Sequence, residues 1–319
     1  MKYLITGATG YIGGQMARRL HSKREHVICL TRNGKRVDDL PVIDGDLLLP
    51  STLVNACGHA DIVIHFAGAL GRGLTPKMIS DINVNGTLNL IHAAKNAGVK
   101  YFLHISSGAV VGPREGKPAD EKTTCCPYTP YEISKYKGEC KALELAQELN
   151  LPLGVARPTF TYGPGDPHKL LMFKLIKKGF FFYIGKGYST NHPVYIDDLL
   201  DGIELMLDKK PKQEVYILGG PKPVTKRNWA ETIAQELNVQ PFFFRFPEKP
   251  TWLGAIVMEG LGKLIRLELP LTRSRILAMS KNWGMDISKA KTELGYSPKI
   301  DLKEGVRKTV SWYRQNKWL

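Results

Sequence analysis

The chain has 319 residues, of which 43% are hydrophobic, enough for one large domain or two fused domains with a packed core. It contains no stretch close to the roughly 18 uninterrupted apolar residues that a membrane span needs, and its first residues show no signal-peptide pattern. The five cysteines and eight histidines have no metal-ligand spacing. We therefore expect a cytoplasmic protein with reduced thiols, no transmembrane segment and no metal.

The formal net charge of +15 comes mostly from the second half, where residues 151–319 hold 27 Lys and Arg against 16 Asp and Glu. A basic field attracts anionic partners. Phosphorylated cofactors or substrates, nucleic acid and an anionic membrane surface all fit this charge, as does a plain solvated surface. Because the chain has no nucleic-acid-binding motif, we expect no nucleic-acid partner.

Short apolar runs alternate with helical patterns in the first half of the chain. The predicted strands are Lys2–Thr6, His26–Thr31, Val42–Ile43, Asp61–Phe66, Lys100–Ser106 and Leu153–Ala156. The predicted helices lie between them, near residues 11–21, 51–57, 78–97 and 131–149. Strands and helices in this order indicate right-handed crossovers and a doubly wound parallel sheet of the α/β class.

The pattern loosens after Pro158, although Val194–Leu207 still predicts a strand end and a helix, and Glu214–Leu218 predicts a further strand. We expect residues 1–165, joined by 190–218, to form the domain built on the parallel sheet. Residues 166–189 and 219–319 should form a smaller α/β lobe that binds the substrate.

Residues 253–265 of this lobe place an apolar stripe on one helical face. The stripe consists of Leu253, Ile256, Val257, Leu261, Leu264 and Ile265. We expect it to pack in the core rather than to act as a membrane anchor.

A glycine-rich turn, Thr6–Gly13, closes the first predicted strand and opens the first helix. Gly7 can form the tight turn, Gly10 lets a pyrophosphate approach the backbone, and Gly13 lets the helix pack closely on the strand. The helix N-terminus then offers free N–H groups and partial positive charge to phosphates. This context predicts a Rossmann-type dinucleotide site. Its expected cofactor-binding residues are Gly7, Thr9, Gly10, Tyr11, Ile12 and Gly13.

The end of the second strand usually selects between the two nicotinamide cofactors. An acidic residue there binds the ribose 2′-hydroxyl, whereas an arginine accommodates a 2′-phosphate. Arg32 occupies this place, and no acidic residue occurs between it and Asp38. We therefore favour NADP(H), with NAD(H) possible, and expect Asp46 and Leu47 to border the adenine.

Tyr131 and Lys135 are four residues apart, which places them on one face of the predicted helix. An ammonium on the next turn should lower the pKa of a phenol, which is ordinarily about 10. Such a pair can act as acid in one direction and as base in the other. A second copy, Tyr313 and Lys317, is interpreted as a chance occurrence. The end of a buried strand adds Ser107, whose hydroxyl could bind the reacting oxygen.

Several further motifs occur in order along the chain. They are His65-Phe66-Ala67-Gly68, Asn83-Val84-Asn85-Gly86-Thr87, Ser106–Pro113, Arg157-Pro158, Tyr162-Gly163-Pro164-Gly165, Val194–Asp198 and Leu294-Gly295-Tyr296-Ser297-Pro298. With the glycine turn and the Tyr131–Lys135 pair, this set resembles the extended short-chain dehydrogenase/reductase superfamily, of the NAD(P)-dependent epimerase/dehydratase type.

The resemblance implies a role for each matching position. Ser107 would be the catalytic hydroxyl, Tyr131 the acid/base, and Lys135 its activator and a ribose ligand. Ala67, Gly68 and Pro158 would line the cofactor, and Asn83 would be structural. The substrate would contact Ser107, Thr159, Thr161, Tyr162 and His192. A homodimer formed through the predicted helices 78–97 and 131–149 is also implied.

Three functions remain open at this point. Ser107-Gly108-Ala109 lacks the acids typical of sugar-nucleotide dehydratases, and Pro118–Glu121 with Tyr183–Gly187 resembles the dihydroflavonol-reductase and 3β-hydroxysteroid-dehydrogenase-like branch. We favour an oxidoreductase that transfers hydride at a secondary alcohol or ketone. The alternatives are an NDP-sugar 4-epimerase with tightly bound NAD and a non-catalytic dinucleotide sensor or scaffold.

Overall fold

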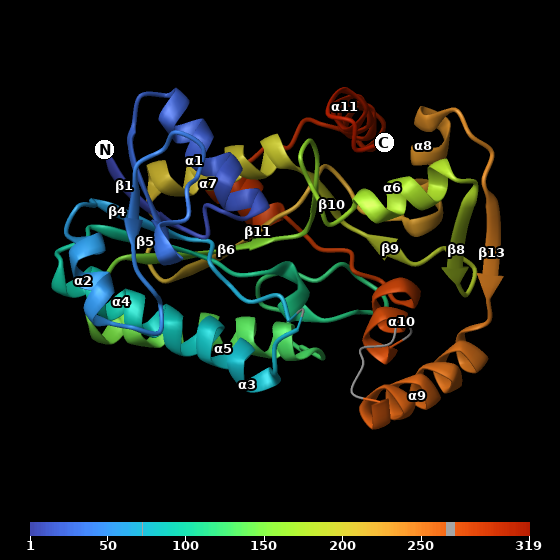
Figure 1. The fold of residues 1–319 in the computed structure, drawn as a ribbon, viewed down its shortest axis with the longest axis horizontal. Helices are drawn as coiled ribbons and strands as arrows, with labels where there is room; N and C mark the ends of the chain where they lie inside the picture. The colour runs from blue at the N-terminus through green and yellow to red at the C-terminus, as the bar shows by residue number, and fades with distance from the viewer. Residues whose placement is uncertain (72, 266–271) are drawn as a thin grey trace.

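A seven-stranded parallel sheet lies at the centre of the computed structural model, in the strand order β11-β6-β5-β4-β1-β2-β3 (Figure 1). The structure describes residues 1–71, 73–265 and 272–319, and their side chains except those of 262–265. The strands are β1 (Lys2–Thr6), β2 (His26–Thr31), β3 (Val42–Asp44), β4 (Ile62–His65), β5 (Tyr101–Ile105), β6 (Leu153–Pro158) and β11 (Glu214–Leu218). The predicted Rossmann-type fold is confirmed, with strand ends within two residues of those expected.

Helices cover both faces of this sheet. Helices α1 (Tyr11–Ser22) and α7 (Ile196–Lys209) lie on one face, and α2 (Ser51–Cys57), α4 (Gly86–Asn96) and α5 (Pro130–Glu148) lie on the other (Figure 1). Successive residues of a strand pack into the cores on opposite faces of the sheet, because side chains alternate along a strand. In β4, Ile64 joins the core beneath α1 and α7, whereas Val63 joins the core beneath α2, α4 and α5.

The predicted helix 78–97 is interrupted in the structure. It consists of α3 (Pro76–Ser80), a π-helical turn η2 (Asp81–Asn85) and α4. The turn contains Asn83, which accepts a hydrogen bond from the Ala69 N–H at 2.6 Å and donates to the Ser134 hydroxyl at 2.8 Å. A Cβ at Gly138 of α5 would lie 2.4 Å from the Asn83 carbonyl oxygen. Through Asn83, the π-helical turn η2 therefore connects the loop after β4 to helix α5. Turns of this kind are often found at functional sites.

The remaining elements extend the molecule beyond the carboxyl ends of the strands. Three small sheets pair β7 (Phe160–Tyr162) with β10 (Pro193–Tyr195), β9 (Thr190–Asn191) with β12 (Val224–Thr225), and β8 (Phe180–Ile184) with β13 (Phe242–Phe246). The helices here are α6 (Leu170–Lys177), α8 (Lys226–Leu237), α9 (Glu248–Ile265), α10 (Arg273–Ser280) and α11 (Leu302–Gln315). Short turns η1 (Arg32–Gly34), η3 (Gly108–Val111) and η4 (Ala290–Leu294) complete the elements.

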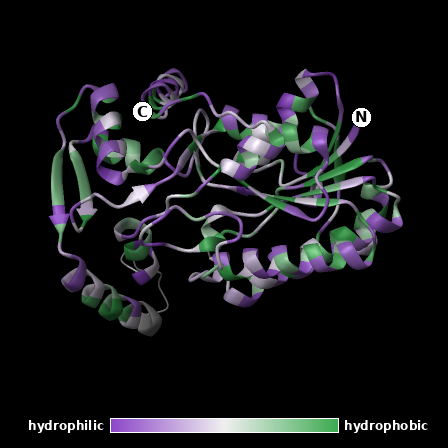
Figure 2. Ribbon diagram, turned by 180° about the vertical axis from the view of Figure 1, so that it is seen from behind, coloured by the Kyte–Doolittle hydropathy of each residue, from purple (hydrophilic) through white to green (hydrophobic). Residues whose placement is uncertain are grey.

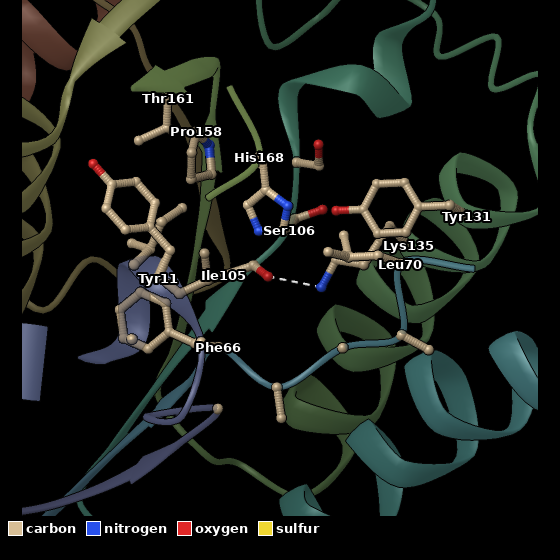
Figure 3. A pocket seen from close by; sticks show the side chains of 18 of the residues that line it. Tyr11, Phe66, Leu70, Ile105, Ser106, Tyr131, Lys135, Pro158, Thr161 and His168 are labelled. Atoms are coloured by element: carbon tan, nitrogen blue, oxygen red, sulfur yellow. Dashed lines mark hydrogen bonds between the residues drawn. The ribbon is translucent and has the colours of Figure 1, made fainter. Parts of the chain in front are cut away.

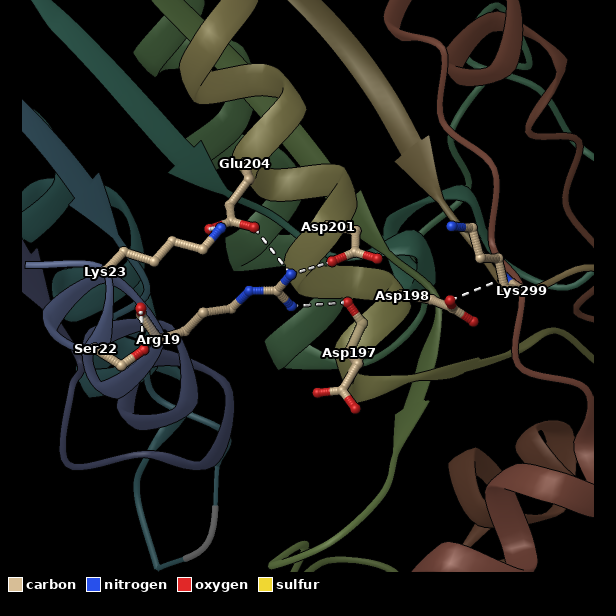
Figure 4. Close-up of polar contacts among 8 residues, drawn as sticks. All are labelled: Arg19, Ser22, Lys23, Asp197, Asp198, Asp201, Glu204 and Lys299. Carbon is tan, nitrogen blue, oxygen red and sulfur yellow. Dashed lines mark hydrogen bonds and ion pairs between the residues drawn. The ribbon is translucent and has the colours of Figure 1, made fainter.

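Charged side chains join α1 to α7 on the outside of the sheet (Figure 4). Arg19 of α1 forms ion pairs with Asp201 and Glu204 of α7, and its second amino group donates to the Asp197 carbonyl oxygen at 3.2 Å. Lys23 adds an ion pair with Glu204 at 2.5 Å. A network of this kind holds the first helix in place more firmly than one exposed pair, which contributes little by itself.

The apolar stripe of α9 faces away from the protein, so its predicted core packing is wrong. Helix α9 packs on α10 through its other side, where Ala255 is buried against Ile276. The exposed fractions of the outward side chains are 64% for Leu253, 44% for Ile256, 55% for Val257 and 48% for Leu261. The side chains of Leu264 and Ile265 lie outside the described part. No helix in the described ranges is long and apolar enough to cross a membrane.

Candidate functional site

A cavity of about 870 Å³ opens at the carboxyl ends of the parallel strands. It begins where the strand order reverses, between β1 and β4, which is where open α/β sheets bind ligands. Nearly all of the predicted site residues line it. They are Gly7, Thr9, Gly10, Tyr11, Ile12, Gly13, Arg32, Asp46, Leu47, Ala67, Gly68, Ser107, Tyr131, Lys135, Pro158, Thr159, Thr161 and His192.

The glycine turn after β1 leaves no room for a side chain at Gly7 or at Gly13. Gly7 has a φ of +72°, and a Cβ on it would lie 2.5 Å from the Ala67 backbone nitrogen. A Cβ on Gly13 would lie 2.5 Å from the Gly7 carbonyl oxygen. The turn therefore packs directly against the segment after β4, because real Cβ atoms do not approach so closely.

The first turn of α1 fits the pyrophosphate of a dinucleotide. Gly10 is its N-cap and supplies no side chain to cap the helix, and Gly10 to Gly13 line the cavity. The N–H groups that begin a helix lack partners within it, and they carry the positive end of the helix dipole. An anion is therefore stabilised at this place.

The far end of the cavity passes over the ends of β2 and β3. Arg32 is exposed, and it forms no ion pair with any described residue. Asp46 lies beside it on the cavity wall, and its carboxylate accepts a hydrogen bond from the Leu48 N–H at 2.9 Å. This end of the cavity thus presents the basic side chain of Arg32 and the acidic side chain of Asp46. A backbone hydrogen bond fixes the position of Asp46.

Tyr131 stands in the first turn of α5, and a capping box sets its position. The Thr129 hydroxyl accepts a hydrogen bond from the Glu132 N–H at 3.2 Å, while the Glu132 carboxylate accepts from the Thr129 N–H at 3.1 Å. This reciprocal pair fixes where the helix begins. The Tyr131 hydroxyl then points into the cavity (Figure 3). Its hydrogen-bond partner is the Ser107 side chain.

Lys135 follows one turn later and is buried. Its ammonium donates a hydrogen bond to the Ile105 carbonyl oxygen at 2.7 Å, at the end of β5 (Figure 3). A Cβ on Gly68 would lie 3.9 Å from the Lys135 nitrogen, so the loop after β4 passes close to it. Burial lowers the pKa of Lys135 to about 8.

The expectation that Lys135 by itself lowers the pKa of Tyr131 is wrong for this structure. Burial raises the pKa of Tyr131, and the hydrogen bond with Ser107 offsets only part of that rise. The Lys135 ammonium is bonded to the Ile105 carbonyl oxygen and does not offset this rise. The neutral phenol is therefore the stable form of Tyr131 in the protein alone.

Ser107 ends the buried strand β5 and begins the turn η3. Its hydroxyl accepts a hydrogen bond from the Ala109 N–H at 3.2 Å, which orients its oxygen toward the cavity. A Cβ on the next residue, Gly108, would lie 2.8 Å from the Met285 sulfur. The strand end is thus covered by a residue nearly 180 positions later in the chain.

Two predicted substrate residues serve the framework in this structure. Tyr162 does not line the cavity, because it is buried in the core with its ring 4.7 Å from that of Trp229. His192 borders the cavity, but one ring nitrogen is bonded to the Gly220 carbonyl oxygen at 2.8 Å and the other to the Met285 N–H at 3.4 Å. Burial lowers its pKa, so His192 is a neutral residue that joins two segments.

Sequence reasoning missed a charged group at the substrate end. Lys169 lines the cavity, with its ammonium 4.3 Å from the centre of the Phe160 ring and 3.8 Å from the Asp166 carboxylate. Burial lowers the pKa of Lys169. The motif Tyr162-Gly163-Pro164-Gly165 precedes Lys169 but gives no signal that this segment faces a cavity. Trp283 and Met285, which also line the cavity, come from a segment without any motif.

The described ranges contain no group of three or more His, Cys, Asp or Glu side chains placed to hold a metal ion.

Comparison with known proteins identifies the family of this chain. The model of the NAD dependent epimerase/dehydratase family matches residues 3–219. The chain belongs to this family. The protein is an enzyme, as the dehydratases and epimerases related to it are.

Individual relatives differ in the reactions that their names describe. A dTDP-glucose 4,6-dehydratase from Streptomyces antibioticus is 27% identical, over 99% of this chain and 93% of its own length. A 3beta-hydroxysteroid-dehydrogenase/decarboxylase from Arabidopsis thaliana is 28% identical, over 84% of this chain and 65% of its own. The solved structure of DesIV, a dTDP-glucose 4,6-dehydratase from Streptomyces venezuelae with NAD bound, superposes with a TM-score of 0.82 at 25% identity, covering 99% and 98% of the two chains.

Proposed function

We propose that the protein is an NAD(P)-dependent oxidoreductase that transfers hydride at a secondary alcohol or ketone, with Tyr131 as its acid/base. The observation that carries this proposal is the Tyr131 hydroxyl, which is bonded to Ser107 inside the cavity and has the Lys135 ammonium on the next turn. These groups stand at the strand ends beyond the glycine turn, where the reactive end of a dinucleotide would lie.

Each residue of this group has a distinct task in the proposed reaction. Tyr131 as the neutral phenol donates its proton to the substrate oxygen during reduction and takes a proton back during oxidation. Ser107 holds that oxygen and stabilises the charge that develops on it. Lys135 places a positive charge behind the phenol, which favours the phenolate once its proton has left.

The residues present fit a bound dinucleotide, which would supply the hydride and the positive nicotinamide ring. The uncapped start of α1 would hold its pyrophosphate. Ala67, Gly68 and Pro158 would contact its ribose and ring. We further propose NADP(H) as the preferred form, because Arg32 is exposed and without an ion-pair partner among the described residues at the place where a 2′-phosphate would lie.

We propose a division of labour between two parts of the chain. Residues 1–165 with 190–218 would bind the dinucleotide, and 166–189 with 219–319 would bind the substrate. The apolar side chains of Trp283 and Met285 on the substrate side favour a largely apolar ketone. Pairing of two copies through α4 and α5 remains our prediction for the oligomer.

A second candidate is a sugar-nucleotide epimerase. The half-buried Lys169 favours it, since it presents a cation to the cavity that could bind a substrate phosphate. Tightly bound NAD and turnover of a UDP-sugar without a net absorbance change at 340 nm would select this candidate. The strand end Ser107-Gly108-Ala109 has no carboxyl group, which argues against a dehydratase.

Tyr131→Phe tests the proposal directly. We expect the rate of ketone reduction to fall by about 10²- to 10⁴-fold, the usual contribution of a positioned acid/base, with little change in NADPH affinity. Reduction is followed by the loss of NADPH absorbance, and binding by the fluorescence of bound NADPH. Tyr136→Phe, one turn further along α5, is the matched control. Unchanged turnover in Tyr131→Phe would exclude Tyr131 as the acid/base.

A further inference from the structure

The outward stripe of α9 is the first part of an unusual apolar surface. Leu253, Ile256, Val257 and Leu261 follow helical spacing along one side of α9, and all four are exposed. The opposite side of the same helix already packs on α10. A stripe of this kind normally faces a core, so its exposure indicates a partner outside the described chain.

The strands next to α9 supply the second part. Strands β8 and β13 pair in parallel, and one face of the pair packs on the core through Tyr183. The other face carries five exposed phenylalanines. These are Phe180, Phe182, Phe242, Phe244 and Phe246. Their rings contact one another across the pair, as between Phe182 and Phe246 at 5.8 Å.

These two parts are neighbours in the fold. Phe246 ends β13 and Glu248 begins α9, so a single residue separates them, and α10 contacts both β8 and α9. Figure 2 shows hydrophobic residues along α9 and along both strands at the end of the molecule far from the N-terminus. We call the four α9 residues and the five phenylalanines the apolar end face.

Exposed cations lie in the segments that carry the apolar end face and in α6, which packs on the core side of β8; among them Arg245 shares the core-side face of the strand pair with Tyr183. Segments 170–190 and 240–261 contain six exposed cations and only two acids. The cations are Lys174, Lys177, Lys178, Lys186, Arg245 and Lys249. None of the six forms an ion pair with a described residue, whereas the acids Glu248 and Glu259 are paired with Lys281 and Arg273 at 2.9 and 2.7 Å. The local charge is therefore positive and uncompensated.

We propose that the apolar end face docks on the surface of an anionic lipid bilayer. An amphipathic helix that lies in the membrane interface combines an apolar side with flanking Lys and Arg residues, and its attraction grows with the anionic lipid content. Helix α9 is not a candidate for crossing the bilayer. Docking of a second copy on the same face would bring two positively charged ends of the molecule together, which opposes a symmetric dimer there.

Docking would place the lipid surface near the wall of the cavity. Helix α9 packs on α10, and Ala278 of α10 lines the cavity together with Trp283. One helix thus separates the proposed lipid contact from the proposed substrate site. This relation to the cavity depends on the proposed function, but the docking itself does not.

Sedimentation of the full-length protein with vesicles tests the proposal. We expect the protein to pellet with vesicles of phosphatidylcholine mixed with phosphatidylglycerol and to remain in the supernatant with phosphatidylcholine alone. Ile256→Glu should weaken binding to the mixed vesicles by at least about tenfold, because it puts a charge on the inserted side. Added salt should weaken binding of the unaltered protein as well.

Val54→Glu is the matched control, since Val54 is 47% exposed on α2, far along the chain from the apolar end face. It introduces the same charge and should bind vesicles as the unaltered protein does. Circular dichroism of each variant verifies folding. Two results would overturn the proposal. One is equal pelleting of Ile256→Glu and Val54→Glu. The other is that the unaltered protein binds neither kind of vesicle and forms a dimer in solution, and that Ile256→Glu dissociates this dimer.

Discussion

Strand β4 and helix α9 both carry apolar side chains, but those of β4 are buried and those along one side of α9 are exposed. Ile64 of β4 is buried between two layers of helices, whereas Ile256 of α9 is 44% exposed at the end of the molecule. Both belong to apolar patterns that predict a core. The difference lies in what surrounds each element, because β4 has a strand on either side and helices over both faces, while α9 contacts the protein through one side only.

Ile64→Ala gives the largest effect that this comparison predicts. Removing a fully buried isoleucine leaves a cavity between tightly packed layers, and we expect the free energy of unfolding to fall by about 2–5 kcal/mol. Urea denaturation followed by circular dichroism measures the loss. A loss below about 1 kcal/mol would mean that β4 is packed no better than α9.

Lys226 tests whether the smaller lobe has a core that excludes water. Its ammonium is buried and donates to the Ser189 hydroxyl at 3.0 Å and the Lys281 carbonyl oxygen at 2.7 Å, and burial lowers its pKa from 10.5 to about 7. Between these two values the unfolded chain binds a proton that the folded chain does not. The free energy of unfolding should therefore rise with pH across this window, by at most about 1.4 kcal/mol per pH unit.

Lys226→Met removes this titration. Urea denaturation of both proteins at several pH values above 7 should show a difference in stability that grows in favour of the unaltered protein as the pH rises. A constant difference would show that Lys226 is open to water.

Arg32→Ala examines the dinucleotide side. Loss of a charge-assisted contact to a 2′-phosphate should weaken NADPH binding by about tenfold or more and leave NADH binding nearly unchanged. Fluorescence titration with the two cofactors gives both dissociation constants. Equal weakening for NADPH and NADH would contradict the proposed preference, and Lys35→Ala, further along the same loop, serves as the control.

Ile256→Ala gives the smallest effect and completes the pair with Ile64→Ala. Because Ile256 faces outward, its truncation should change the free energy of unfolding by less than about 0.5 kcal/mol. The same urea experiment measures it. A loss comparable to that of Ile64→Ala would show that the α9 stripe is covered within the protein itself.

Much of the fold could be predicted because the first half repeats one local pattern. Strands β1, β2 and β11 occupy the residues expected of them, since apolar runs bounded by turn residues are strong signals. The interruption at Asn83 was not predicted. Its π-turn arises from contacts with Ala69 and with α5, which the helical periodicity of that segment does not reveal.

The candidate site divides in the same way. The glycine turn, Ser107, Tyr131 and Lys135 could be located because each belongs to a motif with fixed spacing. Lys169 and Met285 could not, because they reach the cavity from segments distant in the chain. Tyr162 lies in the core rather than on the cavity wall, because its ring packs against Trp229, a contact between distant segments that the sequence does not show.

The amino-acid sequence by itself determined the parallel sheet, the phosphate-binding turn and the spacing of the Tyr131–Lys135 pair, since each depends on residues close together in the chain. Only the tertiary structure decided that burial raises the pKa of Tyr131, that Lys169 faces the cavity and that the α9 stripe faces outward. Desolvation and exposure depend on every segment packed around a residue, and local sequence patterns do not contain that information.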